Sequence, residues 1–162
     1  MVQFTRSVVT MVMGFVAFFW FVAQPDKVER KHDDAPPAIT NGQQVVLTRA
    51  SDGHFYTDAQ VNGRTIHFLV DTGASSVALS REDAETVGLP MDPSKFTGIG
   101  RGASGELSYM PVTLDTVGIG SLEETGVDGV VLAGHGDMSL LGQSWLKRIR
   151  SVTIADDKMT LE

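Results

Sequence analysis

The chain has 162 residues, enough for one hydrophobic core and a terminal appendage but not for two domains. Its net charge of −7, from 13 basic and 20 acidic residues without a basic cluster, argues against nucleic-acid binding, which requires grouped Lys and Arg. Because the chain contains no cysteine, disulfides, thiolate catalysis and thiolate metal sites are excluded, while the redox compartment stays open.

Residues 7–23 form an almost continuous apolar run, close to the lower limit of about 17 residues for a helix that crosses a bilayer. A cleaved signal peptide needs small residues three positions before its cleavage site and directly before it. The only suitable site follows Ala23, and Phe21 occupies the earlier of the two positions. We therefore predict an uncleaved membrane anchor over residues 1–23.

The charges around this run favour a cytoplasmic body, because Lys27, Arg30 and Lys31 follow the run whereas only Arg6 precedes it. Residues 24–43 then combine prolines, a glycine and mixed charges, a composition typical of a tether. The folded domain is expected over residues 44–162.

The domain is expected to begin with strands at residues 44–49 and 54–61. The Asn62-Gly63 pair that follows is the strongest short signal for a β-hairpin. After this turn, the apolar run at residues 66–70 is typical of a buried strand, and it ends at Asp71. The pattern therefore places a carboxylate at a strand end.

A short surface helix is expected after Val77-Ala78-Leu79. Ser80 is a suitable N-cap, and Asp83 three residues later completes a weak form of the capping box. Gly88 and Pro90 are expected to end this helix.

Four glycines punctuate residues 94–110, at positions 98, 100, 102 and 105. No Lys-Ser or Lys-Thr pair follows them and no glycine motif opens a helix, so they do not form a phosphate-binding loop. The spacing favours a mobile hairpin, and an ordinary solvent loop is the alternative.

The C-terminal third continues the β pattern and adds a second helix. The expected order is strands at 112–117, 119–122 and 127–132, a loop at 134–137, a helix at 143–150, and strands at 152–154 and 159–161. The sequence therefore predicts a mostly β domain with two small helices.

Asp71-Thr72-Gly73 is the motif that carries chemistry. A small residue after the carboxylate allows a tight turn, and the threonine hydroxyl can bond to backbone or to a second subunit. Hydrolysis of a peptide bond by carboxylates needs two of them, yet neither Asp52-Gly53 nor Asp128-Gly129 has the intervening hydroxyl residue. Half a site on a short chain points to a symmetric homodimer that brings two Asp71 side chains together.

With Leu140-Leu141-Gly142 about seventy residues further on, Asp71-Thr72-Gly73-Ala74 resembles the retropepsin-type aspartic proteases. Val61-Asn62-Gly63, the run from Phe68 to Ala74, and the run from Leu140 to Leu146 resemble the membrane-anchored bacterial branch of that family more closely. The resemblance covers roughly residues 44–162.

This resemblance implies a closed, barrel-like acid-protease fold and an aspartic endopeptidase that needs no cofactor. Asp71 would be the catalytic carboxylate, supported by Thr72, Gly73 and Ala74. A flap that closes over substrate would include Gly102, Ala103, Ser104 and Gly105. The partners would be a second copy and an extended protein or peptide substrate. The resemblance also implies an inner-membrane protein with a periplasmic domain, against the Lys and Arg count.

Other interpretations stay open. Asp71 could be an exposed residue in an Asx-turn, and the same fold could serve as a non-catalytic peptide-binding or dimerisation module. Ala103-Ser104-Gly105 departs from the Ala-Asn-Gly that is more usual in the branch. A membrane-anchored scaffold with a chance Asp-Thr-Gly would instead be a monomer.

Metal and serine-hydrolase sites are not expected. His54, His67 and His135 lie in separate predicted elements without paired-ligand spacing. Ser75-Ser76 lacks the glycine pattern of a nucleophile elbow. Trp145 is expected in the core or in a dimer contact.

Overall fold

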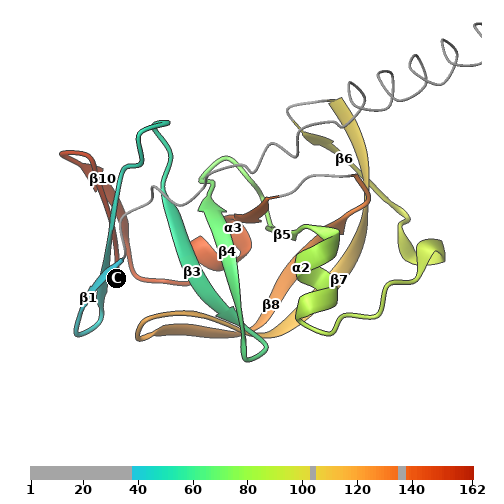
Figure 1. Ribbon diagram of the computed structural model, residues 1–162, viewed down its shortest axis with the longest axis horizontal. Coiled ribbons are helices and arrows are strands. Elements are labelled where there is room, and N and C mark those ends of the chain that lie inside the picture. The colour runs from blue at the N-terminus through green and yellow to red at the C-terminus, as the bar shows by residue number, and fades with distance from the viewer. Residues whose placement is uncertain (1–37, 103–104, 135–137) are drawn as a thin grey trace, which may run out of the picture. The chain divides into compact units, whose positions relative to one another are not determined.

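The computed structural model describes residues 38–102, 105–134 and 138–162, and Figure 1 shows their arrangement. The predicted anchor and most of the predicted tether lie outside these ranges. Among the described residues, no helix combines the length and the apolar character that a membrane span requires.

A small antiparallel sheet joins the start of the described chain to its end. Its order is β1 (Ile39–Asn41), β2 (Gln44–Thr48), β11 (Lys158–Leu161) and β10 (Val152–Ala155). Strand β1 lies within the predicted tether. The turn after Asn41 folds β1 back onto β2, so the small sheet begins a few residues before the predicted start of the domain at residue 44. The C-terminal hairpin is confirmed, and both residues of its turn, Asp156 and Asp157, adopt positive φ angles of 49° and 58°.

The larger sheet forms the body of the domain. Its order is β3 (Tyr56–Val61), β4 (Arg64–Val70), β9 (Ser139–Leu141), β5 (Val77–Leu79), β8 (Leu122–Leu132), β7 (Gly105–Ile119) and β6 (Gly98–Gly102). Strand β3 also pairs with the far end of β7, at Gln60 with Gly118 and Val61 with Val117. This pairing closes the sheet on itself, in agreement with the predicted barrel.

The strand boundaries predicted at 112–117 and 119–122 are wrong. A single long strand, β7, runs to Ile119, the chain turns at Gly120, and β8 begins at Leu122. Gly120 has a φ of 58°, which a glycine adopts without strain, so the turn falls inside an apolar run that alternation alone reads as a strand.

Both predicted helices are present, and a 3-10 turn, η1 (Pro93–Lys95), accompanies them. The first, α2 (Arg81–Thr86), has Ser80 as its N-cap, as predicted. The second, α3 (Gln143–Leu146), ends four residues before the predicted Arg150. The Arg148 side chain donates to the carbonyls of Thr125 and Gly126, and from Ser151 on the backbone bonds to Glu162 and enters the small sheet.

The core fills the barrel and extends beneath the small sheet. Its largest fully buried side chains are Trp145, Phe68, Leu47, Leu79, Leu114, Leu141, Met159 and Leu161. The prediction that Trp145 is buried is confirmed, since its exposed fraction is 0%. Its indole Nε1 donates to the carbonyl of Val117 at 2.9 Å, which joins α3 to β7 through the interior.

Candidate active site

Asp71 stands at the end of β4, where the barrel holds its backbone in place. Strand β4 pairs in parallel with β9, with Val70 opposite Leu141. The ladder continues one bond further, because the Asp71 N–H donates to the Leu141 carbonyl at 3.1 Å. The side chain itself is half-buried, so the barrel aims a partly accessible carboxylate at a fixed position.

The turn after Asp71 fixes the carboxylate as well as the backbone. The Gly73 N–H donates to Asp71 Oδ1 at 2.8 Å, and the Ala74 N–H donates to the Asp71 carbonyl at 3.2 Å. A Cβ on Gly73 would lie 3.2 Å from the same Oδ1, so a glycine best allows this approach. The contact has the form of an Asx-turn and orients one oxygen of the carboxylate.

The first residue of α3 is hydrogen-bonded to this loop. The Gln143 N–H donates to the Ala74 carbonyl, and Gln143 Nε2 donates to the Thr72 carbonyl, both at 2.8 Å. A Cβ on Gly142 would lie 2.3 Å from the Ser76 carbonyl oxygen, so only glycine fits here. The Leu140-Leu141-Gly142 segment therefore packs directly beside the Asp71 loop.

Hydrogen bonds of polar side chains also connect α2 to strand β9. Ser139 Oγ accepts from the Ser80 N–H at 3.0 Å and donates to Asp83 Oδ2 at 2.5 Å. Ser80 Oγ accepts from the Asp83 N–H, so only one arm of the predicted capping box is direct. The buried Ser139 bridges the other arm and connects the helix cap to β9.

A cleft of about 710 Å³ opens beside Asp71, and we call it the main cleft. It is lined by Asp71, Gly73, Ala74, Ser75, Ser76, Ala78, Gly100, Arg101, Leu107, Tyr109, Val130, Leu132 and Leu140. One wall is the Asp71 loop with β5 and β9, and the other is the face of β6, β7 and β8. The cleft therefore combines one carboxylate with mostly apolar walls, an arrangement typical of a ligand-binding site.

A second cavity of about 310 Å³ also borders the Asp71-Thr72 segment, and we call it the side cavity. It is lined by Arg49, Gly53, His54, Phe55, Leu69, Val70, Asp71, Thr72, Ile154 and Met159. Residues of the small sheet, Ile154 and Met159, thus border the same space as the carboxylate loop.

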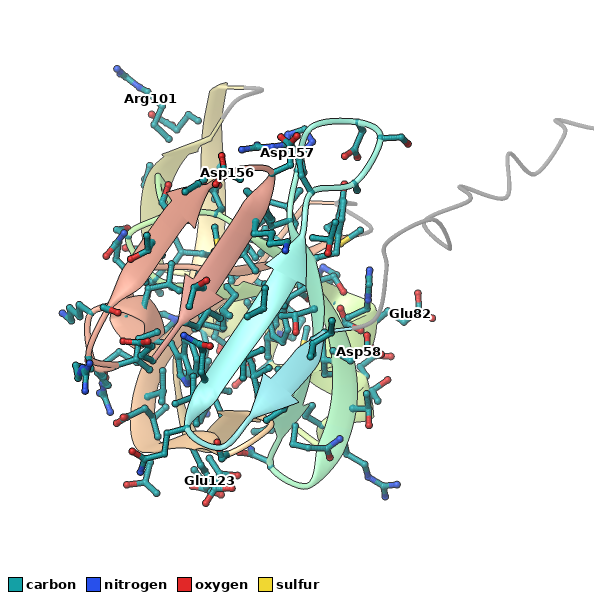
Figure 2. The ribbon with its side chains drawn as sticks, turned by 90° about the vertical axis from the view of Figure 1, so that its left-hand side faces the viewer. Asp58, Glu82, Arg101, Glu123, Asp156 and Asp157 are labelled. Atoms are coloured by element: carbon teal, nitrogen blue, oxygen red, sulfur yellow. The ribbon has the colours of Figure 1, made fainter. Side chains whose placement is uncertain are left out.

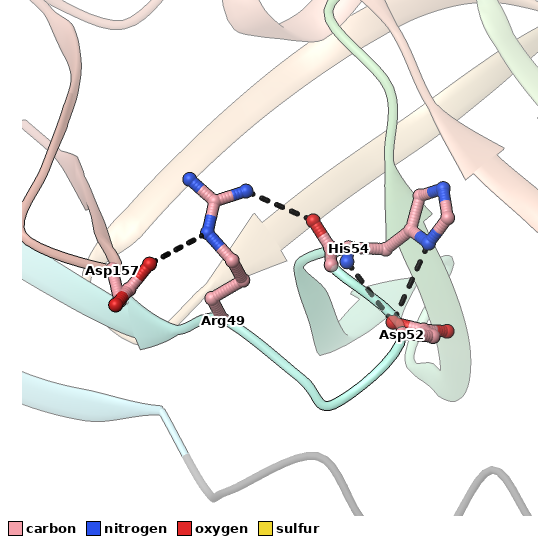
Figure 3. A network of polar contacts seen from close by, with 5 residues as sticks. Arg49, Asp52, His54 and Asp157 are labelled. Carbon is pink, nitrogen blue, oxygen red and sulfur yellow. Dashed lines mark hydrogen bonds and ion pairs between the residues drawn. The ribbon is translucent and has the colours of Figure 1, made fainter.

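The loop between β2 and β3 is held by the polar network of Figure 3. Arg49 donates from Nε to Asp157 Oδ1 at 3.1 Å and from an Nη to the Gly53 carbonyl at 2.9 Å. Its guanidinium also lies 4.5 Å from the centre of the Phe55 ring. The His54 N–H donates to Asp52 Oδ1 at 2.9 Å. These contacts fix the wall of the side cavity.

Tyr56 and Asp52 form a strong pair beside this loop. The Tyr56 hydroxyl donates to Asp52 Oδ2 at 2.6 Å. Burial, together with this bond to the carboxylate, raises the pKa of Tyr56 from 10.0 to about 12. The same bond, followed by the bond from the His54 N–H, lowers the pKa of Asp52 from its ordinary value of 3.8.

Tyr56→Phe should move the Asp52 pKa upward, towards 3.8, because its main stabilising donor is removed. A carboxylate with a depressed pKa stabilises the fold above the unfolded value of 3.8, and this contribution is lost as pH falls through the folded value. The variant should therefore lose less stability on acidification. Carboxyl chemical shifts recorded against pH measure the change. Asp92, whose pKa is lowered by Ser94, is the control that should stay constant.

The structure brings part of the predicted site together. Asp71, Gly73 and Ala74 line the main cleft, while Thr72 borders the side cavity. Gly102 pairs with Gly105 at the end of the β6–β7 hairpin, and Ala103 and Ser104 between them lie outside the described residues. The described hairpin residues that line the main cleft are instead Gly100, Arg101, Leu107 and Tyr109.

Sequence reasoning missed the apolar walls of the cleft. Val130, Leu132 and Leu140 look like ordinary core residues in the sequence. Their shared position facing Asp71 follows from strand pairings between distant segments, such as Tyr109 with Leu132. Among the described residues, no group of His, Cys, Asp and Glu side chains has the geometry of a metal site. His135, one of the three histidines considered in the sequence analysis, lies outside those residues.

Comparison with known proteins agrees with this architecture. Residues 57–148 match the family model described as "gag-polyprotein putative aspartyl protease". Among solved structures, the chain is similar to a retropepsin-like aspartic protease from Rickettsia conorii, with 41% identity, 73% of this chain and 98% of that chain covered, and a TM-score of 0.66. The EIAV protease complexed with the inhibitor HBY-793 shares the fold at 16% identity and a TM-score of 0.50, over 68% of this chain and 93% of that chain.

Two curated proteins are also similar. An uncharacterized protein of Rickettsia prowazekii (strain Madrid E) is 41% identical over 118 residues, and one encoded in the cobV 5′ region of a Sinorhizobium species is 39% identical over 120 residues. These matches cover 73% and 74% of this chain but only 51% and 52% of the relatives, so the chain spans about half the length of the curated relatives. The family match over residues 57–148, the shared fold and the Asp71 loop together place this chain in the retropepsin-like aspartic protease family.

Proposed function

We propose that this protein is an aspartic endopeptidase that works as a homodimer, with a water molecule activated between two Asp71 carboxylates. The observation that carries the proposal is the position of Asp71. Its carboxylate is half-buried, held by the Gly73 N–H, and set at the edge of a cleft with apolar walls. The test is hydrolysis of unfolded protein by the full chain and its Asp71→Asn variant, followed by mass spectrometry.

The chemistry requires two carboxylates in different protonation states. Two carboxylates a few ångströms apart cannot both ionise without strong repulsion, so the pair holds one proton. The ionised group takes a proton from water as the oxygen attacks the scissile carbonyl, and the protonated group donates to the carbonyl oxygen. The leaving amine then receives a proton from the pair. Activity should therefore rise and fall with pH in a bell-shaped profile.

The outer edge of β10 is the surface that we assign to the second copy. Among the described residues, β10 has a neighbour on one side only, β11. Ser151 and Glu162 exchange two backbone bonds, of 3.0 and 3.1 Å, so the N–H and C=O groups of Val152 and Ile154 point to the other side. Ile154 is 49% exposed and borders the side cavity with Asp71, which links this edge to the site.

A two-fold axis at Thr153 allows the outward N–H and C=O groups of β10 to pair with those of β10 in a second copy. Val152 then pairs with Ile154 of the partner subunit, and the ladder continues from one small sheet into the other. The same register sets Arg150 opposite Asp156 of the partner subunit. Figure 2 shows Asp156 and Asp157 at the turn of the β10–β11 hairpin, at the same end of the described body as Arg101. The opposite charges at the two ends of β10 favour this antiparallel arrangement.

Arg150→Glu and Asp156→Arg should each weaken the dimer, and the double variant should restore it. Two symmetric pairs at about 0.2–1 kcal/mol each correspond to an increase in Kd of roughly twofold to thirtyfold. Sedimentation velocity over a concentration series measures this change. Arg64→Glu, an exposed charge on β4, is the matched control. A dimer that is insensitive to both single variants would contradict the β10 interface.

We also propose that residues 1–23 anchor the protein as a single membrane pass, with the protease domain on the periplasmic side. The apolar run over residues 7–23 supports the anchor, and the family resemblance supports its orientation. Accessibility of an epitope at the C-terminus in intact spheroplasts tests the orientation.

A further inference from the structure

Tyr109 lies flat on the backbone of a neighbouring strand. In the hairpin of β6 and β7, Tyr109 is directly opposite Gly98, and Leu107 is opposite Gly100. A Cβ on Gly98 would lie 2.2 to 2.6 Å from three atoms of the Tyr109 ring, and one on Gly100 would lie 3.3 Å from the ring. The ring therefore occupies the space that side chains would fill at these two positions of β6.

The covered face of the hairpin is a wall of the main cleft. Gly100, Leu107 and Tyr109 all border that cleft together with Asp71. On the other side of Tyr109, its partner on β8 is Leu132, which lines the same space. Successive residues of a strand face opposite sides, so Ile99, which is 67% exposed, projects from the other face of β6.

The two glycines thus determine how far the ring enters the cleft. The β6 backbone lies directly beneath the ring, so any side chain at Gly98 must displace the ring, and the open direction is into the cleft. Gly98 has no positive φ, and an alanine there meets no backbone strain. A single substitution at Gly98 on β6 therefore moves the Tyr109 ring, and a single substitution at Tyr109 on β7 removes it.

We infer that Tyr109, resting on Gly98 and Gly100, sets the size of the substrate side chain that fits beside the scissile bond. This inference rests on the proposed endopeptidase function and names its specificity-determining residue. The ring is the largest side chain on the β6–β7 wall of the cleft, and the side chains from β5, β8 and β9 opposite or beside it are Ala78, Val130, Leu132 and Leu140. Shortening Tyr109 enlarges the space, and displacing it from Gly98 reduces the space.

The test compares peptides that differ only in one residue next to the scissile bond, either Ala, Leu, Phe or Trp. Relative to the wild type, Tyr109→Ala should raise the ratio of kcat/KM for the Trp peptide over the Leu peptide at least tenfold. Gly98→Ala should lower that ratio by a similar factor, since changes of this size in an apolar pocket correspond to about 1–3 kcal/mol. Ile99→Ala is the matched control on the opposite face of β6, and its ratio should stay at the wild-type value.

A binding series keeps this inference separate from the proposed catalysis. The same peptides are titrated by calorimetry into the full chain carrying Asp71→Asn, with and without Tyr109→Ala or Gly98→Ala. The role of Tyr109 is supported if Tyr109→Ala shifts the binding preference towards the Trp peptide and Gly98→Ala shifts it towards the smaller peptides, whether or not the wild type cleaves peptides. Identical size preferences in all backgrounds, or no peptide binding by the folded dimer, would overturn it.

Discussion

Asp71→Asn should reduce peptide cleavage by about a hundredfold to ten-thousandfold, the usual contribution of a positioned general acid or base. The substitution preserves shape and keeps an oxygen that accepts from the Gly73 N–H, which is 2.8 Å from Oδ1 in the wild type. The loop conformation should therefore survive. What the variant loses is the ionised oxygen that takes the proton from water.

The experiment uses the full chain with unfolded protein as substrate, from about pH 4 to 7.5, with peptide products identified by mass spectrometry. Asp128→Asn is the matched control, because Asp128 also precedes a glycine but lies on the exposed face of β8. Equal cleavage by Asp71→Asn and the wild type would sink the proposed mechanism. No cleavage by a confirmed wild-type dimer would instead favour the non-catalytic peptide-binding module.

The features that were predictable from the sequence are those set by neighbouring residues. The β3–β4 hairpin follows from Asn62-Gly63, whose φ angles of 48° and 77° suit the turn that the pair predicts. Asp71 at a strand end follows from the apolar run before it, and the α2 start follows from the Ser80 cap. In each case a few adjacent residues determine the local geometry.

The features that were not predictable depend on residues far apart in the chain. The Gly98 and Gly100 spacing indicates a hairpin, yet the reason for those glycines is the Tyr109 ring across the strand pair. Gly142 likewise looks like a turn residue, but the Ser76 carbonyl oxygen, 2.3 Å from its would-be Cβ, is what excludes other residues. Long-range strand pairing decides both positions, and local propensity carries no information about it.

The early end of α3 has the same origin. Beyond Leu146 the sequence remains compatible with a helix, but Arg148 is held by two carbonyls of β8 and Ser151 pairs with Glu162. The Ser151 N–H is bonded to the Glu162 carbonyl, so it is not free for the helical bond to the Lys147 carbonyl. What remains of α3 is the single turn whose first residues clamp the Asp71 loop.

Trp145 anchors that short helix in the core, and Trp145→Ala should lower the free energy of unfolding by about 3–5 kcal/mol. The side chain is fully buried, so its removal leaves a large cavity in the barrel and a Val117 carbonyl without its 2.9 Å donor. Because single domains have only about 5–15 kcal/mol of stability, this loss is a large share of the total. Urea unfolding of the full chain, followed by circular dichroism, measures it.

Trp145→Phe separates the packing of the ring from its hydrogen bond. Phenylalanine keeps much of the apolar volume but cannot donate to Val117, so the expected loss is smaller, about 1–3 kcal/mol for an unpaired buried carbonyl. A loss below about 1 kcal/mol in Trp145→Ala would show that the core collapses around the gap. The position of the Asp71 loop would then rest on its bonds to Leu141 and Gln143 and not on the packing of Trp145.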